Sequence, residues 1–329
     1  MLFDKPGLAG RLPASQRTFA SNQNSMTRFT LDPKPVRLLL LLGALLAPIC
    51  ASAAQLQPET AKAFEQQVAA AEQWSKDRLD GRAPFLGTNA SADRRQRLQS
   101  GELVVSPRQG KGDIAVEKGI IHHWIGGVFV PGRSAADALD LLRDFDSYQR
   151  IYTASVEQSK TLQRRGDVSR AYLRLRKHRI VTVVLNTEYL VEFVRADDRR
   201  WYSRSVSTRI AQVKDPGSSE EHELPVGDDS GFLWRIVTFW RIEEADGGVY
   251  LECEVLGLTR GVPYGLGWLI RPIIRSFPRD ALAETLTDTR NALLGISRDV
   301  SPPRSLSRVN ELSAPPRTAP SSAIEAALP

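Results

Sequence analysis

The stretch FLWRIVTFWRIEEADGGVYLECEVLGLT, residues 232–259, decides the fold of this chain, because it contains two alternating runs on either side of a short turn. Alternation of apolar and polar residues is typical of β-strands with one buried face, and an Asp-Gly pair favours a tight reversal of the chain. We predict that residues 232–243 and 248–259 form an antiparallel hairpin around Ala245-Asp246-Gly247.

The pairing within this hairpin is predicted from its apolar residues. Setting Trp240 opposite Leu251 and Thr238 opposite Cys253 makes one face of the hairpin wholly apolar or small. A slip of one residue would bring glutamate side chains onto that face, so we expect the first pairing.

Segments on the N-terminal side of the hairpin extend the sheet. Each is rich in β-branched or aromatic residues and bounded by turn-forming residues, as strands are. The predicted strands span residues 120–130, 154–162, 170–193 and 200–213. The third is too long for one flat strand, so we expect a turn near Lys177–His178 to split it.

Two helices accompany these strands. Ser134, with Asp137 three residues later, is an acidic variant of the capping box and predicts the start of a helix. A longer helix is expected from Ser276-Phe277-Pro278 to Gly295. Its buried stripe is formed by Leu282, Leu286, Thr289 and Leu293. An antiparallel sheet with one apolar face must cover that face, and the terminal helix is the available cover, so the fold class is α+β.

The segments outside this region have different compositions. Residues 58–79 predict an amphipathic helix. Its apolar stripe contains Phe64, Val68, Ala71 and Ser75. Residues 81–118 are rich in Gly, Arg, Gln and Ser, and we expect a linker with at most a short strand at residues 103–105. The tail after Ser297 is rich in Pro, Ser and Ala, which predicts disorder.

Residues 36–54, VRLLLLLGALLAPICASAA, have the order of a secretory signal. Basic residues precede an apolar run that is shorter than the roughly 20 residues of a membrane span, and small residues follow it. Cleavage fits after Ala53 or Ala54. We therefore expect export across the inner membrane to the periplasm, with Met26 as a fitting start for the signal.

The positive charge of the chain is concentrated in the leader. The formal net charge is +6, but six of the 44 basic and two of the 38 acidic residues lie within residues 1–54. The remaining 38 basic and 36 acidic residues leave too small an excess to attract a phosphate backbone, so we expect no nucleic-acid partner.

The chain offers few groups for metal or redox chemistry. Cys50 lies in the leader, so Cys253 alone remains after cleavage and no intramolecular disulfide forms. His122 and His123 are adjacent on a predicted strand and point to opposite faces. We expect neither a metal site nor a cofactor.

The order of elements resembles the START-like superfamily (SRPBCC), which includes Bet v 1-like proteins and polyketide cyclases and has the helix-grip fold. The stretches that look like those of exported bacterial members are GIIHHWIGGVFVPG (119–132), IVTVVLNTEY (180–189), YSRSVSTRIAQV (202–213), GDDSGFLWRIVTFWRIEE (227–244), and VPYGLGWLI with IIRS (within 262–276). The resemblance covers roughly residues 120–295. It implies a curved antiparallel sheet wrapped around a long C-terminal helix, with a cavity for an apolar small molecule between them.

The chain is thus expected to have five parts. The first is an N-terminal extension that is either non-native or disordered (1–25). The others are a signal peptide (26–54), an N-terminal helix and linker (55–118), a START-like domain (119–296) and a disordered tail (297–329).

Several side chains are candidates to line the implied cavity. Ser203, Ser205, Ser207 and Arg209 share one face of their predicted strand, which is either an outer face or the wet side of the cavity. In the second case Arg209 could hold a carboxylate or a phosphate. The hairpin tryptophans either pack in the core or form pocket walls. The candidate ligand-binding residues are His123, Thr187, Tyr189, Ser205, Ser207, Arg209, Trp234, Thr238, Trp240 and Cys253.

Residues 262–277 are apolar and aromatic with two interspersed arginines. They form either a buried loop or a flap that dips into a membrane surface while the arginines meet the headgroups. The candidate membrane-contact residues are Tyr264, Trp268, Ile270, Arg271, Ile273, Ile274 and Arg275.

The first functional hypothesis is a non-enzymatic carrier of a hydrophobic, lipid-like or isoprenoid-like small molecule, with transient membrane contact. The second is a cyclase or hydrolase that uses the same cavity, and the third is an envelope interaction protein without a cavity. Catalytic candidates are few (His123, Glu188, Arg209 and Cys253), and no serine has a G-x-S-x-G setting, so the carrier is favoured.

Overall fold

The computed structural model describes residues 54–88, 91–178, 182–261 and 267–296, with the backbone alone for residue 54 and residues 267–276. The predicted signal peptide lies outside this part apart from its last residue, as do the extension 1–25 and the tail 297–329. None of the described helices is long and apolar enough to cross a membrane.

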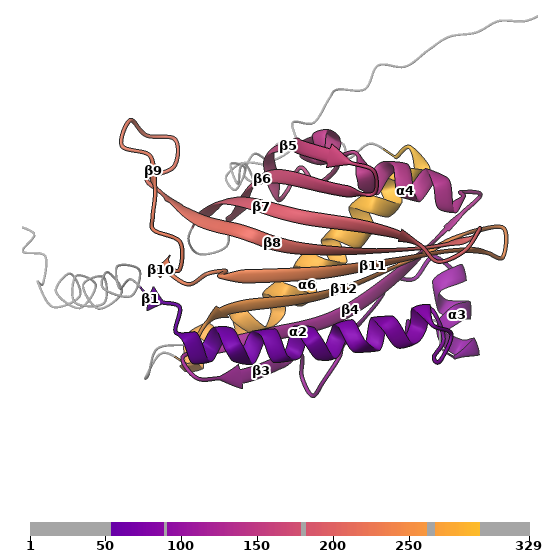
Figure 1. Ribbon diagram of the computed structural model, residues 1–329, viewed down its shortest axis with the longest axis horizontal. Helices are drawn as coiled ribbons and strands as arrows, with labels where there is room; N and C mark the ends of the chain where they lie inside the picture. The colour runs from indigo at the N-terminus through magenta and orange to yellow at the C-terminus, as the bar shows by residue number, and fades with distance from the viewer. Residues whose placement is uncertain (1–53, 89–90, 179–181, 262–266, 297–329) are drawn as a thin grey trace, which may run out of the picture. The chain divides into compact units, whose positions relative to one another are not determined.

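Ten strands form one antiparallel sheet in the described part of the chain (Figure 1). They are β2 (Val104–Pro107), β3 (Asp113–Val116), β4 (Gly119–Pro131), β5 (Val156–Arg165), β6 (Val168–His178), β7 (Thr182–Arg195), β8 (Arg200–Lys214), β9 (His222–Glu223), β11 (Arg235–Ala245) and β12 (Gly248–Arg260). The main order is β2-β4-β12-β11-β8-β7-β6-β5, while β3 pairs with β4 and β9 with β8. β1 (Ala54–Gln55) and β10 (Asp228–Asp229) form a separate pair.

Helices cover both faces of the sheet (Figure 1). The inner face is the one on which α4 (Ala135–Arg143) and α6 (Gly267–Leu294) pack, and the outer face is the one on which α2 (Pro58–Leu79) packs. The helix side chains buried in the inner core are Ala135, Ala138, Leu139, Leu142, Leu282, Leu286 and Leu293. The shorter helices are α3 (Ala92–Gln99), α5 (Tyr148–Ile151) and the 3-10 helix η2 (Phe145–Ser147).

The predicted α+β fold, with a C-terminal helix packed on an antiparallel sheet, is confirmed. The capping box is present, since Ser134 Oγ accepts a hydrogen bond from Asp137 N at 3.1 Å and the Asp137 carboxylate accepts one from Ser134 N at 2.9 Å. The helix predicted over residues 58–79 has those bounds, and its predicted stripe is buried. β6 ends at His178, where the turn was expected.

The hairpin has a different register from the predicted one. Trp240 pairs with Cys253 and Thr238 with Val255, a shift of two residues that leaves the paired side chains of β11 and β12 on their predicted faces. The cause is the turn. Ala245 pairs with Gly248, and Asp246 and Gly247 have φ values of 55° and 74°, as a two-residue hairpin turn of this twist requires.

Residues 81–118 also differ from the predicted linker. They contain α3, β2 and β3; β2 overlaps the short strand predicted at residues 103–105, and both strands pair with β4. Strands of four residues are too short to give a periodic signal, and their backbone groups find partners only on the edge of β4. Both strands therefore belong to the same sheet as β4.

The terminal helix α6 begins at Gly267, earlier than predicted. Pro278 lies inside it instead of in its first turn. The φ of a proline is close to the helical value, so a proline alone does not mark a helix start.

Candidate functional site

A row of partly accessible side chains crosses the inner face at the centre of the sheet. Ser205 on β8, Thr238 on β11 and Val255 on β12 are paired neighbours in this row. All three are partly accessible, although central strands carry them, whereas Phe239 and Glu254 beside them on the outer face are fully buried. The described helices therefore leave these three inner-face side chains within reach of solvent or a ligand.

The other predicted pocket residues on the inner face are buried around this row. Thr187 donates a hydrogen bond to the Leu173 carbonyl at 2.8 Å, and Ser207 Oγ accepts one from Ile236 N at 3.0 Å. Tyr189, Trp240 and Cys253 belong to the core that α6 covers. Seven of the ten candidate ligand-binding residues thus lie on this face, namely Thr187, Tyr189, Ser205, Ser207, Thr238, Trp240 and Cys253.

The described cysteine and tyrosine side chains of the inner core are neutral at physiological pH. Burial raises the pKa of the Cys253 thiol and of the Tyr189 phenol. Burial also raises the pKa of Tyr148 and of Tyr152, whose hydroxyl lies 3.0 Å from Thr289 Oγ1. An apolar surface with neutral hydroxyls can hold a hydrophobic molecule and orient a single polar group on it.

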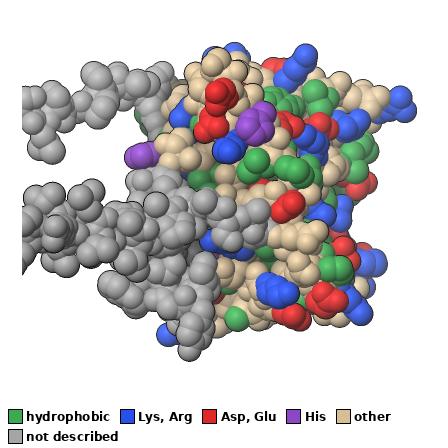
Figure 2. Space-filling view, turned by 90° about the vertical axis from the view of Figure 1, so that its left-hand side faces the viewer, with side chains coloured by type: hydrophobic (Ala, Val, Ile, Leu, Met, Phe, Trp, Pro, Cys, Tyr) green, Lys and Arg blue, Asp and Glu red, His purple; other side chains and the backbone are tan. Residues whose placement is uncertain are grey.

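Arg209 does not share the face of the strand serines, contrary to the prediction. Glu188 pairs with Arg209 and Tyr189 with Ser207, so Thr208 has no partner in the β7–β8 ladder and forms a β-bulge. One extra residue reverses the alternation beyond it. Arg209 consequently lies on the outer face in an ion pair with Glu223, which the serine pattern could not reveal. Acidic and basic side chains are interspersed on the end of the domain shown in Figure 2.

Trp234 also lies on the outer side. It precedes β11 and packs in the core beneath α2. Its indole N–H donates to Asp229 Oδ1 at 3.1 Å, and burial raises the pKa of that carboxyl. Of the two roles considered for the hairpin tryptophans, core packing describes Trp234.

His123 lies on the outer face as well, in a buried group of charges that the sequence did not predict. This outer-face charge cluster consists of Arg78, Arg108, His123, Arg241, Glu252 and Glu254. At its centre the Arg241 guanidinium lies 3.1 Å from both Glu252 and Glu254, and all three side chains are fully buried.

The cluster joins the sheet to α2 and to the segment that follows it. Arg241 donates to Ser75 Oγ on α2 at 2.6 Å, and the backbone N–H of Thr88 donates to Glu252 at 2.6 Å. Gly127 permits this approach, because a Cβ there would lie 2.5 Å from Thr88 Oγ1. Helix and sheet are therefore linked by buried polar contacts as well as by apolar packing.

Trp74 of α2 adds aromatic contacts to the cluster. The guanidinium carbons of Arg78 and Arg108 lie 3.4 and 3.6 Å from the centre of its ring. Arg78 also donates to the carbonyls of Pro84 and Phe85 at 2.7 and 3.0 Å. Burial lowers the pKa of Arg78 to about 10, so it stays charged at neutral pH.

Glu254 has three side-chain partners in the cluster, namely His123, Arg108 and Arg241. Its carboxylate lies 2.8 Å from His123 Nε2 and 3.3 Å from Arg108 Nε. Burial raises the pKa of Glu254, but the His123 hydrogen bond and the charge of Arg241 outweigh it, and the net pKa is lowered.

The register explains why the sequence did not reveal this cluster. The predicted pairing set Arg241 beside Tyr250, whereas the observed one sets it directly opposite Glu252. An arginine and two glutamates on one face of a hairpin are a recognisable charge pattern once the Asp246-Gly247 turn fixes the pairing.

The membrane-contact prediction concerns residues whose side chains the structure does not describe. Tyr264 lies outside the described residues, and no side chain is described for the other six candidates, Trp268, Ile270, Arg271, Ile273, Ile274 and Arg275. Within the described residues, no group of three or more His, Cys, Asp or Glu side chains is arranged to hold a metal ion.

Comparison with known proteins gives likeness at the level of fold. No family model matches the chain, and no curated protein matches it. The STAR-related lipid transfer protein from Xanthomonas axonopodis is 17% identical, with 56% of this chain and 99% of that chain covered and a TM-score of 0.38. The Zhui aromatase/cyclase from Streptomyces sp. R1128 is 16% identical, with 53% of this chain and 92% of that chain covered and a TM-score of 0.36.

A START superfamily protein from Mycobacterium smegmatis is 12% identical, covering 54% of this chain and 99% of that chain, with a TM-score of 0.36. These proteins are members of the superfamily that the sequence resembles. The likeness concerns the fold alone, so the function of this chain rests on its own residues.

Proposed function

We propose that this protein binds a hydrophobic small molecule, lipid-like or isoprenoid-like, against the inner face of its sheet and carries it without converting it. The observation that supports this proposal is the accessible row of Ser205, Thr238 and Val255 at the centre of a face whose buried side chains are apolar or carry hydroxyl groups. A ligand there would cover apolar surface and meet two hydroxyl groups.

The placement of the catalytic candidates favours a carrier over a cyclase or hydrolase. Arg209, Glu188 and His123 lie on the outer face and are paired with Glu223, Arg170 and Glu254, respectively. Cys253 alone lies on the inner face, and its raised pKa keeps it a thiol. The four catalytic candidates therefore do not meet on the inner face, as a general acid–base pair would require.

Native mass spectrometry of the purified mature protein, with lipid extraction, tests the binding. We expect a co-purifying apolar molecule, which Thr238→Phe reduces by filling the accessible row. Leu190→Phe is the matched control, because it adds a ring at a position that is 40% exposed on the outer face of β7. A wild-type protein that carries no ligand and takes up none from membrane extract would overturn the proposal.

The proposal includes export to the periplasm, on the strength of the residue order in the leader. N-terminal sequencing of protein recovered from the periplasmic fraction should give a chain that begins at Ala54 or Gln55. Recovery of the intact leader on cytoplasmic protein would contradict this part.

The proposal also includes loading at a membrane surface by residues 262–277. Replacing Trp268 and Ile273 by serine should weaken association with liposomes, since apolar side chains drive interfacial binding. Unchanged association of the double variant would remove the membrane contact from the proposal and leave the ligand site in place.

A further inference from the structure

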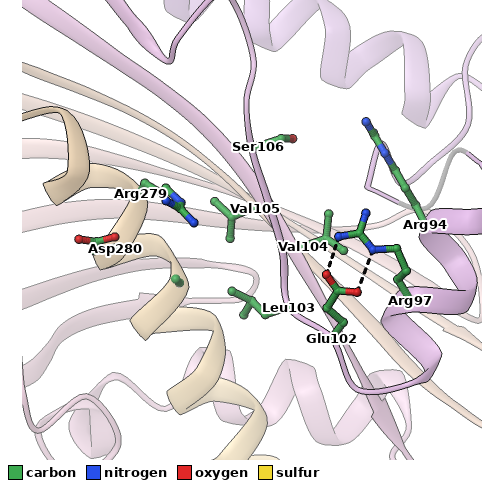
Figure 3. Close-up of a pocket in the computed structure, with 10 residues that line it drawn as sticks. Arg94, Arg97, Glu102, Leu103, Val104, Val105, Ser106, Arg279 and Asp280 are labelled. Atoms are coloured by element: carbon green, nitrogen blue, oxygen red, sulfur yellow. Dashed lines mark hydrogen bonds and ion pairs between the residues drawn. The ribbon is translucent and has the colours of Figure 1, made fainter.

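A pocket of about 330 Å³ lies at the edge of the sheet, between α3, the start of β2 and α6 (Figure 3). Leu103, Val104 and Val105 form its apolar wall, and Ala283 approaches from α6. Leu103 and Val105 also pack against the inner core. The wall of the pocket is therefore apolar and rests on the inner core.

Two arginines line this pocket. Arg94 projects from α3 and Arg279 from α6, on opposite sides of the apolar wall (Figure 3). Both are exposed, and neither guanidinium has an ion pair or side-chain hydrogen bond with any residue that the structure describes.

The acidic groups of the pocket do not neutralise this pair. Glu102 is engaged by Arg97, whose Nε and Nη2 lie 2.8 and 2.5 Å from its two carboxylate oxygens. That fork holds the turn between α3 and β2 in place. Asp280 also lines the pocket and is itself engaged by a partner, and its carboxylate adds one negative charge to the lining. Three arginines against two carboxylates leave the pocket positive.

We infer that this pocket holds the anionic head group of an amphiphile, a carboxylate or a phosphate, whose apolar part lies on Leu103 and Val105. Arginine suits both groups, because its planar fork donates two parallel hydrogen bonds to them. The inference rests on the proposed function and narrows it, since it requires a ligand with one charged end.

Binding measurements with four probes test the inference: dodecyl phosphate, dodecanoate, dodecanol and inorganic phosphate. The wild-type protein should prefer the two anionic amphiphiles to dodecanol. The double variant Arg94→Gln/Arg279→Gln should bind them about tenfold more weakly, the scale of one lost charge-assisted interaction, and should bind dodecanol as before. The difference should shrink at high salt, because both arginines are exposed.

Arg133→Gln/Arg150→Gln is the matched control, since it removes the same charge from exposed positions outside the pocket. Retention of the anionic preference in the pocket variant would overturn the inference. Arginine-dependent binding of inorganic phosphate without any gain from the alkyl chain would overturn it too, because the site would then take a free anion. If no alkyl probe binds, dodecanol included, the proposed function itself fails.

Discussion

Arg241 is the residue on which the outer face depends most. It is fully buried between two glutamates that are themselves fully buried, and it reaches Ser75 on α2. Taking three charges out of water is unfavourable, so their mutual attraction and hydrogen bonds must offset the desolvation. A cluster of this kind tolerates the loss of one partner poorly, because the remaining charges stay buried.

Arg241→Met should therefore lower the free energy of unfolding by about 3–5 kcal/mol, the range measured when one partner of a buried ion pair is removed. Urea denaturation followed by circular dichroism measures it. Arg195→Met is the control, because Arg195 pairs with Asp198 while both side chains are exposed, and its effect should stay below about 0.5 kcal/mol. Equal losses in the two variants would contradict the structural role of the cluster.

Glu254 should make stability depend on acid pH. Its folded-state pKa lies below the ordinary value of 4.5, so the ionised carboxylate stabilises the fold fully above that pH. The contribution is lost as the pH falls below 4.5 and through the folded-state pKa. The stability advantage of wild type over Glu254→Gln should therefore shrink as the pH is lowered from neutral to below 4.5. Other carboxylates titrate in both proteins, so a difference that is independent of pH would contradict the assignment.

At the scale of elements, the β11–β12 hairpin shows where sequence reasoning succeeds and where it stops. The side-chain alternation predicted which residues of β11 and β12 share a face, and that prediction is confirmed within the paired strands but not for Trp234, which precedes β11. It could not separate registers that differ by two residues, since both keep the same faces. The φ values of Asp246 and Gly247 select the observed register, and turn geometry is only partly encoded by residue type.

Gly247→Val should destabilise the hairpin by about 1–2 kcal/mol, because a β-branched side chain resists the φ of 74° that the turn imposes. Thermal unfolding monitored by calorimetry measures this. Gly257→Ala on β12 is the control, since the new Cβ would lie 3.7 Å from Leu233 Cδ1, an ordinary contact, and the change should stay within about 0.5 kcal/mol. A larger loss at Gly257 than at Gly247 would mean that the turn does not fix the register.

Other elements show the same division. The amphipathic helix and the capped helix were predicted from local patterns, which tertiary packing did not override. The bulge at Thr208 and the strand β3 were not predicted, and β2 only as a short strand at residues 103–105, because their form depends on partners distant in sequence. The predicted pocket residues of β8 show the same effect. Ser205 and Ser207 precede the bulge and lie on the predicted face, whereas Arg209 follows the bulge and does not.

At the scale of the molecule, one sheet carries two different layers. The inner face combines apolar side chains with neutral hydroxyls and is the proposed ligand surface. The outer face carries buried charges beneath α2, in contact with Ser75 and the backbone of Thr88. The charges thus lie on the side away from the proposed ligand, where they stabilise the scaffold without presenting ions to an apolar molecule.

This separation predicts that ligand binding and the outer-face charge cluster act on stability independently. Dodecanoate at a hundredfold excess over its Kd should raise the free energy of unfolding by about 2.7 kcal/mol in wild type. The gain in Arg241→Met should agree within about 0.5 kcal/mol, since side chains on opposite faces share no partner. Ser75→Ala offers a milder test if Arg241→Met unfolds too readily, because it removes one hydrogen bond of the same cluster. Unfolding of each protein with and without dodecanoate gives the coupling directly, and a value above about 1 kcal/mol would show that the two faces communicate through the strands they share.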